Sequence, residues 1–139
     1  MALLVLIDTN VILDLLLARP AFMLEAQRIT DRVEAGTYRA LLCATTITNI
    51  DYLARKQLGG AAARTAIAAL LDLYDIAAVT RATLKMAVTS EMPDFEDAVL
   101  AYSAHLAGAQ AIVTRNLRDF AKSPVRAYTP GQFLALQNP

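Results

Sequence analysis

Cysteine and histidine are almost absent from this chain of 139 residues. Cys43 is the single cysteine, so the chain can form neither an internal disulfide nor a cluster of thiolate ligands. His105 is the single histidine, which excludes a metal site with two histidine ligands from one chain. A metal site in this protein would therefore have to rely on oxygen ligands.

Long apolar runs and an excess of charge are also missing. No apolar run reaches the roughly 18 residues that a membrane-spanning helix needs, because Asp8, Asp14 and Arg19 interrupt the first one. No basic segment precedes Leu3, which argues against a signal peptide. The 13 basic and 13 acidic side chains cancel, so net charge does not by itself predict a nucleic-acid partner. We expect a soluble, cytoplasmic protein that makes no contact with a membrane.

What the chain does contain is enough apolar sequence for one core. With 56% hydrophobic residues it is too apolar to be disordered, and its length suits a single domain, residues 1–139. Short apolar runs predict five strands, at residues 3–7, 39–45, 75–80, 110–116 and 125–129. Helical patterns fall between them, at residues 11–17, 21–35, 46–58, 61–74, 81–89 and 94–108, with a short helix after Thr129. This alternation predicts an α/β domain: a five-stranded parallel sheet between helices.

Polar residues follow several of the predicted strands directly. Asp8, Thr9 and Asn10 end the first run, and Asn49 lies shortly after the second. Residues 114–119, TRNLRD, follow the fourth, and residues 94–97, DFED, open the long helix. Ligands of open α/β sheets bind at the carboxyl ends of the strands, so we expect these polar groups to meet at one edge.

Each of these residues also has a structural explanation. Asp8, Asn10 or Asp94 could cap the helix that follows it, and Asn116 and Asp119 could be turn residues. Asp8, however, ends a buried run, where a carboxylate is costly without a partner or a cation. Asp97 shares a helix face with small residues at 101, 104 and 108, which would let that helix approach the sheet, whereas Glu96 is expected to point away into solvent.

Convergence of Asp8, Asp97 and Asp119 would place three like charges together. Such a group raises its own pKa values unless a cation balances it. Oxygen ligands without cysteine or histidine suit Mg²⁺ or Mn²⁺. The sequence therefore predicts a divalent-cation site at the edge of the sheet.

The motifs DTNVILD from Asp8, DFEDAVLAYSA from Asp94 and VTRNLRDF from Val113 resemble those of PIN-domain proteins, in particular VapC-type toxin ribonucleases. The resemblance implies an α/β/α sandwich around a five-stranded parallel sheet, and Mg²⁺- or Mn²⁺-dependent hydrolysis of RNA phosphodiester bonds. It also implies a cognate antitoxin as partner and a homodimer. We expect the helix pair of residues 11–33 to offer an apolar docking surface for a partner, although plain core packing explains that pattern as well.

The resemblance also assigns roles to residues of this chain. It implies metal ligation by Asp8, Asp97 and Asp119, and a further catalytic acid at Asp94. The residues implied to line the substrate side are Thr9, Asn10, Asn49, Thr114, Arg115 and Asn116. Asn49 stands where relatives carry a second acid, and Asp51, about 200° further round the helix, is not expected to replace it. Arg115 and Arg118 are candidate phosphate contacts, with Arg55 and Lys56 as further candidates.

The departure at Asn49 keeps a second hypothesis open. A PIN-like domain that has lost catalysis would act as a binding module for RNA or protein. Cation binding distinguishes the two hypotheses, because such a module need not bind Mn²⁺.

Overall fold

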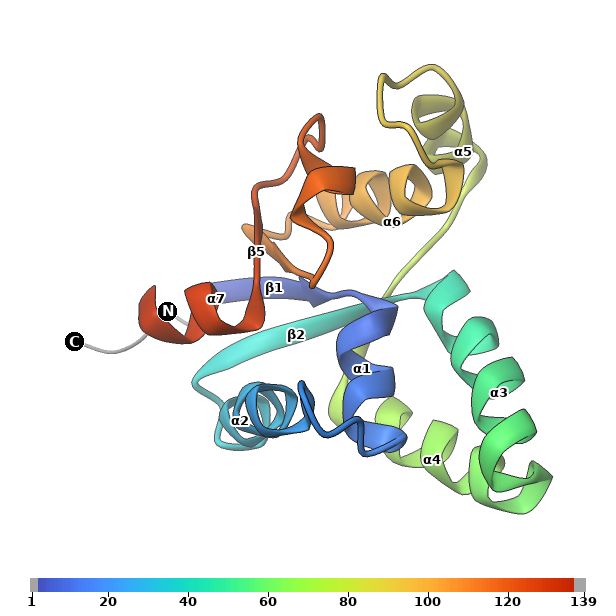
Figure 1. Cartoon of the computed structure of the whole chain (residues 1–139). Coiled ribbons are helices and arrows are strands. Elements are labelled where there is room, and N and C mark those ends of the chain that lie inside the picture. Colours follow the sequence, from blue (N-terminus) through green and yellow to red (C-terminus); the bar gives the residue numbers. More distant parts are fainter. Residues whose placement is uncertain (1–2, 137–139) are drawn as a thin grey trace.

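The computed structural model describes residues 3–136 and shows a parallel sheet between two layers of helices (Figure 1). The strands are β1 (Leu3–Ile7), β2 (Tyr38–Cys43), β3 (Asp75–Ala77), β4 (Ala111–Val113) and β5 (Ala127–Tyr128). They form one sheet in the order β3-β2-β1-β4-β5, and every neighbouring pair is parallel. The predicted fold class is therefore confirmed.

Seven α-helices and one short 3₁₀ helix lie within the described residues. The helices are α1 (Thr9–Leu16), α2 (Met23–Glu34), α3 (Ala44–Leu58), α4 (Gly60–Leu73), α5 (Arg81–Val88), α6 (Phe95–Leu106) and α7 (Pro130–Leu136), with the 3₁₀ helix η1 at Leu117–Phe120. None of the helices within residues 3–136 is long and apolar enough to cross a membrane.

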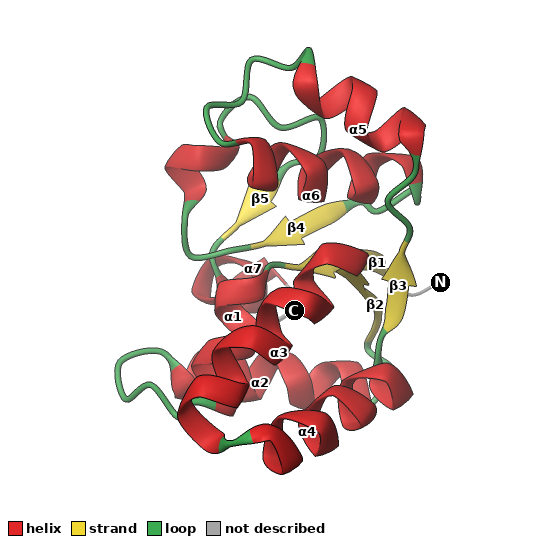
Figure 2. Ribbon diagram, turned by 90° about the vertical axis from the view of Figure 1, so that its right-hand side faces the viewer, coloured by secondary structure: helices red, strands yellow, loops and turns green. Residues whose placement is uncertain are grey.

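Successive side chains along each strand point to opposite faces of the sheet and so pack into two separate hydrophobic cores. Val5 and Ile7 of β1 face the layer formed by α1 to α4 and α7, whereas Leu6 faces α5 and α6. Figure 2 shows these two layers on opposite sides of the sheet. Ala101 and Ala104 of α6 are fully buried against the second face, as the small-residue pattern predicts. This close packing holds the start of α6 beside the strand ends.

Helix ends follow local chemistry, and several predicted bounds differ from those in the structure. The predicted strand 39–45 ends at Cys43, because Ala44 and Thr45 already belong to the first turn of α3. Neither Thr46 nor Thr48 caps α3. The N-cap residue is Cys43, and its side chain forms no capping hydrogen bond with the backbone of the helix. The long helix ends at Leu106 rather than at Gly108, whose φ of 81° lies in the left-handed region that favours glycine.

Candidate functional site

The candidate site lies where β1 and β4 end side by side. The amide of Asp8 donates to the carbonyl of Val113 (2.9 Å), which ties the ends of the two strands together. From β1 the chain proceeds to β2 and β3 on one side, and only later returns to place β4 on the other. Such a change of direction is the usual ligand-binding position in an open α/β sheet.

Asp8 caps α1 and presents a buried carboxylate at the end of β1. Its Oδ1 accepts from the amide of Thr9 (2.7 Å) at the start of α1, and its Oδ2 accepts from the hydroxyl of Thr114 (2.7 Å). The side chain is 6% exposed, and burial raises the pKa of Asp8 while these two hydrogen bonds lower it in part. Each oxygen retains a lone pair, so the fixed carboxylate can still accept a further contact.

Asp97 lies in the first turn of α6 among other acids. Its amide donates to Oδ1 of Asp94 (2.9 Å), so Asp94 caps α6 as one of the two interpretations predicted. Burial raises the pKa of Asp97 most, and together with the charges of Asp8, Asp94, Asp119 and Glu96, in decreasing order of effect, brings it to about 7. Asp119, in η1 after β4, therefore lies near enough for its charge to act on Asp97, as do Asp8 and Asp94.

The raised pKa of Asp97 makes the stability of the metal-free protein pH-dependent. Between about pH 4 and pH 7, native Asp97 keeps a proton that the unfolded chain has released, so unfolding releases a proton. Rising pH therefore destabilises the native state, and we expect this loss to reach on the order of 1–2 kcal/mol by about pH 8, after allowance for partial exposure.

The measurement is urea unfolding in EDTA at several pH values, for the native chain and for Asp97→Asn. The variant should gain stability relative to the native chain as pH rises through about 7. A difference between the two proteins that does not change with pH would contradict this assignment.

Hydroxyls and amides of the predicted substrate side hold the loops around the carboxylates. The hydroxyls of Thr9 and Thr46 lie 2.9 Å apart, which joins α1 to α3. The amide of Arg115 donates to Oδ1 of Asn10 (3.4 Å), and the amide of Asn116 donates to Oγ1 of Thr114 (3.0 Å). Each contact positions a segment that carries one of the acids.

Asn49 and Glu96 form a contact that the sequence prediction missed. Nδ2 of Asn49 donates to Oε1 of Glu96 at 2.7 Å, so Glu96, although exposed, does not point away from the site. Its charge raises the pKa of both Asp8 and Asp97. Asp51 forms an ion pair with Arg55 (3.4 Å) on α3, in line with the expectation that it does not replace the missing acid.

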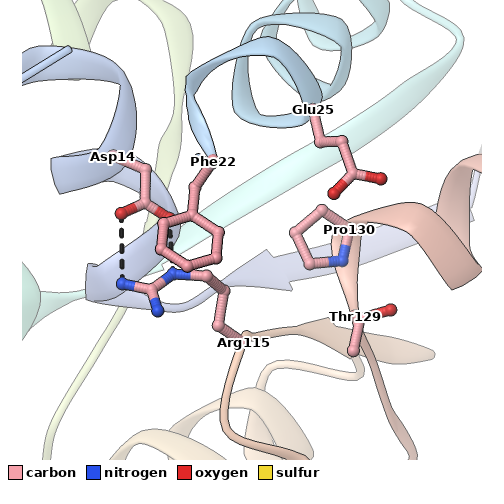
Figure 3. Close-up of a pocket in the computed structure, with 6 residues that line it drawn as sticks. All are labelled: Asp14, Phe22, Glu25, Arg115, Thr129 and Pro130. Carbon is pink, nitrogen blue, oxygen red and sulfur yellow. Dashed lines mark hydrogen bonds and ion pairs between the residues drawn. The ribbon is translucent and has the colours of Figure 1, made fainter. Parts of the chain in front are cut away.

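Arg115 is held by a buried partner, Asp14, that the sequence did not single out as a site residue. Nε of Arg115 lies 2.6 Å from Oδ2 of Asp14, Nη2 lies 3.1 Å from Oδ1, and Asp14 is 1% exposed (Figure 3). Arg19 adds a third contact at 3.2 Å, and the guanidinium of Arg115 stacks over the ring of Phe22. A pocket of about 370 Å³ lies here, and the residues that line it are Asp14, Phe22, Glu25, Arg115, Thr129 and Pro130.

This arrangement narrows the candidates for phosphate contact. The guanidinium of Arg115 is already committed to Asp14, Arg55 is paired with Asp51, and Lys56 lies over the ring of Tyr52. Arg118 is exposed and forms no ion pair within residues 3–136. Phosphate contact by any of the four stays a prediction.

Two signals could have pointed to the missed residues. Asp14 follows Asn10 by four positions, one helical turn, and so lies on the same face of α1. Glu96 belongs to the DFED stretch, but periodicity along α6 cannot reveal that α3 presents an amide to it.

The acids match the chemistry of a hard cation but are not drawn together as ligands. Within residues 3–136 no group of three or more His, Cys, Asp and Glu side chains is arranged so that it could hold a metal ion. The donor set consists of oxygens alone, and the mutual repulsion that raises the pKa of Asp97 is what a divalent cation relieves. We conclude that the residue types fit Mg²⁺ or Mn²⁺, and that binding would require the side chains to move closer together.

Comparison with known families identifies the family of the chain. Residues 4–118 match the PIN domain, so the chain belongs to the PIN domain family. A search among curated proteins finds no match.

Solved structures show the same fold over nearly the whole chain. A VapBC2 complex from Rickettsia felis, bound to a promoter DNA fragment, is 12% identical with a TM-score of 0.72, over 91% of this chain and 98% of that chain. A toxin–antitoxin complex from Klebsiella pneumoniae is 23% identical (TM-score 0.68, 91% and 97%). VapC20 from Mycobacterium tuberculosis, a toxin that cleaves the sarcin–ricin loop, is 19% identical (TM-score 0.63, 78% and 86%).

Proposed function

We propose that the protein is a Mg²⁺- or Mn²⁺-dependent endoribonuclease, the toxin of a VapBC-like toxin–antitoxin pair. One observation carries the proposal: in a PIN-domain chain, the charges of Asp8, Asp94 and Asp119 all act on Asp97 and raise its pKa, so these acids lie near one another at the carboxyl edge of the sheet. None of the four forms an ion pair with a lysine or arginine within the described residues. Structural similarity to proteins described as VapBC complexes supports the toxin role.

In this proposal Asp8, Asp97 and Asp119 hold the cation. Asp8 is prepared for ligation, since Thr9 and Thr114 fix both of its oxygens. Asp97 must give up the proton that its raised pKa retains, so cation affinity rises with pH. When bound, the ion supplies a water of lowered pKa and stabilises the negative charge that develops on the phosphate and the leaving oxygen.

Other residues of the site position the RNA. Asp94 caps α6 and so fixes the first turn that carries Asp97. Asn10 and Asn116 flank the carboxylates on α1 and on the segment after β4, where their amides can bind ribose or base groups. The exposed guanidinium of Arg118 can contact a phosphate without reading sequence.

The chemistry of the product ends tests this mechanism. Attack by water on phosphorus, with the 3′ oxygen leaving, yields a 5′ phosphate and a 3′ hydroxyl. End-labelled RNA fragments should therefore accept extension by a polymerase at the 3′ end without prior phosphatase treatment. Fragments that end in a 2′,3′-cyclic phosphate would contradict the mechanism, because they arise when the 2′ hydroxyl of the RNA itself attacks.

A second candidate function rests on Asn49. A PIN domain without the usual acid at that position could be a non-catalytic module that binds RNA or protein. Titration with Mn²⁺ separates the two functions, since the proposed enzyme binds Mn²⁺ at micromolar to millimolar concentration and loses it in Asp97→Asn. Binding of RNA without Mn²⁺ binding or cleavage would favour the module.

The proposed partners are an antitoxin and a second copy of the chain, in the cytoplasm. Leu13 is buried, and Leu16 and Leu17 pack against the core, so the expected docking surface on α1 and α2 is smaller than the sequence suggests. Phe22 and Met23 are each 39% exposed and remain available to a partner.

A further inference from the structure

The bond between Asn49 and Glu96 links α3 directly to the first turn of α6, the turn that carries Asp97. Asn49 lies in the second turn of α3 and Glu96 in the first turn of α6, and the two side chains meet at 2.7 Å. Oε2 of Glu96 accepts no hydrogen bond from residues 3–136, and the residue forms no ion pair there. Asn49 thus holds Oε1 of Glu96, while Oε2 remains available to accept a further contact.

Glu96 lies close to the carboxylates of the candidate site. Its charge is felt by both Asp8 and Asp97, whose pKa values it raises. A long glutamate side chain on the protein surface can turn into water, and a helix N-terminus stabilises it there equally well. Here the side-chain amide of Asn49 instead holds one oxygen of Glu96 while its charge acts on Asp8 and Asp97, and a cation among these carboxylates would attract all three.

We propose that Glu96 supplies to the cation site the carboxylate that position 49 lacks, and that Asn49 is the positioning residue that holds it there. This inference rests on the proposed function. In the related toxin ribonucleases the resemblance implies an acid on the helix after the second strand, whereas here that helix carries an amide. The fourth carboxylate then comes from α6, beside Asp97, and α3 contributes only the hydrogen bond.

Binding of Mn²⁺ by the full chain, followed through the loss of the electron paramagnetic resonance signal of free Mn²⁺, tests the proposal without RNA. We expect Glu96→Gln, which keeps an acceptor for Asn49, to raise the Mn²⁺ dissociation constant by about 10-fold or more, because partners around metal ligands are worth about 10–100-fold in affinity. Asn49→Ala should raise the Mn²⁺ dissociation constant by less, because Glu96 keeps its charge and loses only the hydrogen bond from Asn49 that positions it. Glu91→Gln is the matched control, an exposed glutamate with only a long contact to Lys122 (3.8 Å), and should bind as the native chain does.

The double variant Asn49→Glu with Glu96→Gln tests whether Mn²⁺ affinity can be rescued. It moves the carboxylate from α6 to α3 and should restore affinity to within about threefold of the native value. Asn49→Asp with Glu96→Gln serves the same purpose if the longer side chain perturbs folding, which thermal unfolding of each variant monitors. Native affinity in Glu96→Gln, or affinity in both double variants no better than in Glu96→Gln, would overturn the inference.

Asp97→Asn distinguishes failure of this inference from failure of the proposed function. If Asp97→Asn loses Mn²⁺ and Glu96→Gln does not, the cation site stands and Glu96 has no part in it. If the native chain binds no Mn²⁺ at millimolar concentration, the proposed function fails and the inference falls with it.

Discussion

The Asp8→Asn variant will fold normally and will fail to cleave RNA. Asparagine has the same size, and its oxygen can still accept from the amide of Thr9, so α1 keeps an equally good N-cap. The new amide group can donate to the hydroxyl of Thr114. Because burial raises the pKa of Asp8, loss of the charge also removes a desolvation cost, and the melting temperature should not fall.

The expected loss of cleavage is more than about 100-fold, since even residues that only support metal ligands are worth about 10–100-fold. The measurement is the initial rate of RNA cleavage in Mn²⁺ alongside a thermal unfolding curve. Asp51→Asn is the matched control, because Asp51 pairs with Arg55 on α3 and takes no part in the proposed site. Cleavage at the native rate by a folded Asp8→Asn protein would remove Asp8 from the mechanism.

The Arg115→Ala variant will lose about 2–4 kcal/mol of unfolding free energy. Asp14 is 1% exposed and has Arg115 as its closer partner, with contacts at 2.6 and 3.1 Å. Removing one partner of a buried pair leaves an uncompensated charge, which typically costs about 3–5 kcal/mol. Arg19 remains as a second partner and reduces that cost here.

Guanidinium chloride unfolding of two further variants tests this explanation. Arg19→Ala should cost less than about 1 kcal/mol, because Arg19 is 38% exposed and contributes one contact. Arg115→Lys should fall between the two, since it keeps the charge but loses the paired contacts and the stacking on Phe22. Equal, small losses in Arg115→Ala and Arg19→Ala would show that Arg115 is free to act as a phosphate contact instead.

The order of strands and helices could be predicted because a buried parallel strand is a short apolar run with a clear start. The carboxyl ends of these strands were less certain, since the polar residues that follow them begin the next element. Thr45 illustrates this: it continues the β2 run in sequence but lies in the first turn of α3. The start of the last helix after Thr129 was predicted correctly, and two reciprocal hydrogen bonds between Thr129 and Gln132 cap α7 there.

Within the site, the sequence predicted that Asp8, Asp97 and Asp119 lie near one another, but not how neighbouring residues hold them. Their proximity could be predicted because each of them follows a strand or opens a helix at the same edge of the sheet. The pair of Asp14 and Arg115 spans 101 positions, and no local pattern links the two residues. Likewise, the bond between Asn49 and Glu96 depends on how α3 and α6 approach each other, which helical periodicity does not specify.

Cleavage of a labelled single-stranded RNA by the purified protein in Mn²⁺ tests the central claim most directly. EDTA and the Asp97→Asn variant, purified in the same way, serve as controls against a contaminating nuclease. The proposed function predicts cleavage by the native chain that disappears in both controls. Cleavage that persists in EDTA or in Asp97→Asn, or a native protein that neither binds Mn²⁺ nor cleaves RNA, would contradict it.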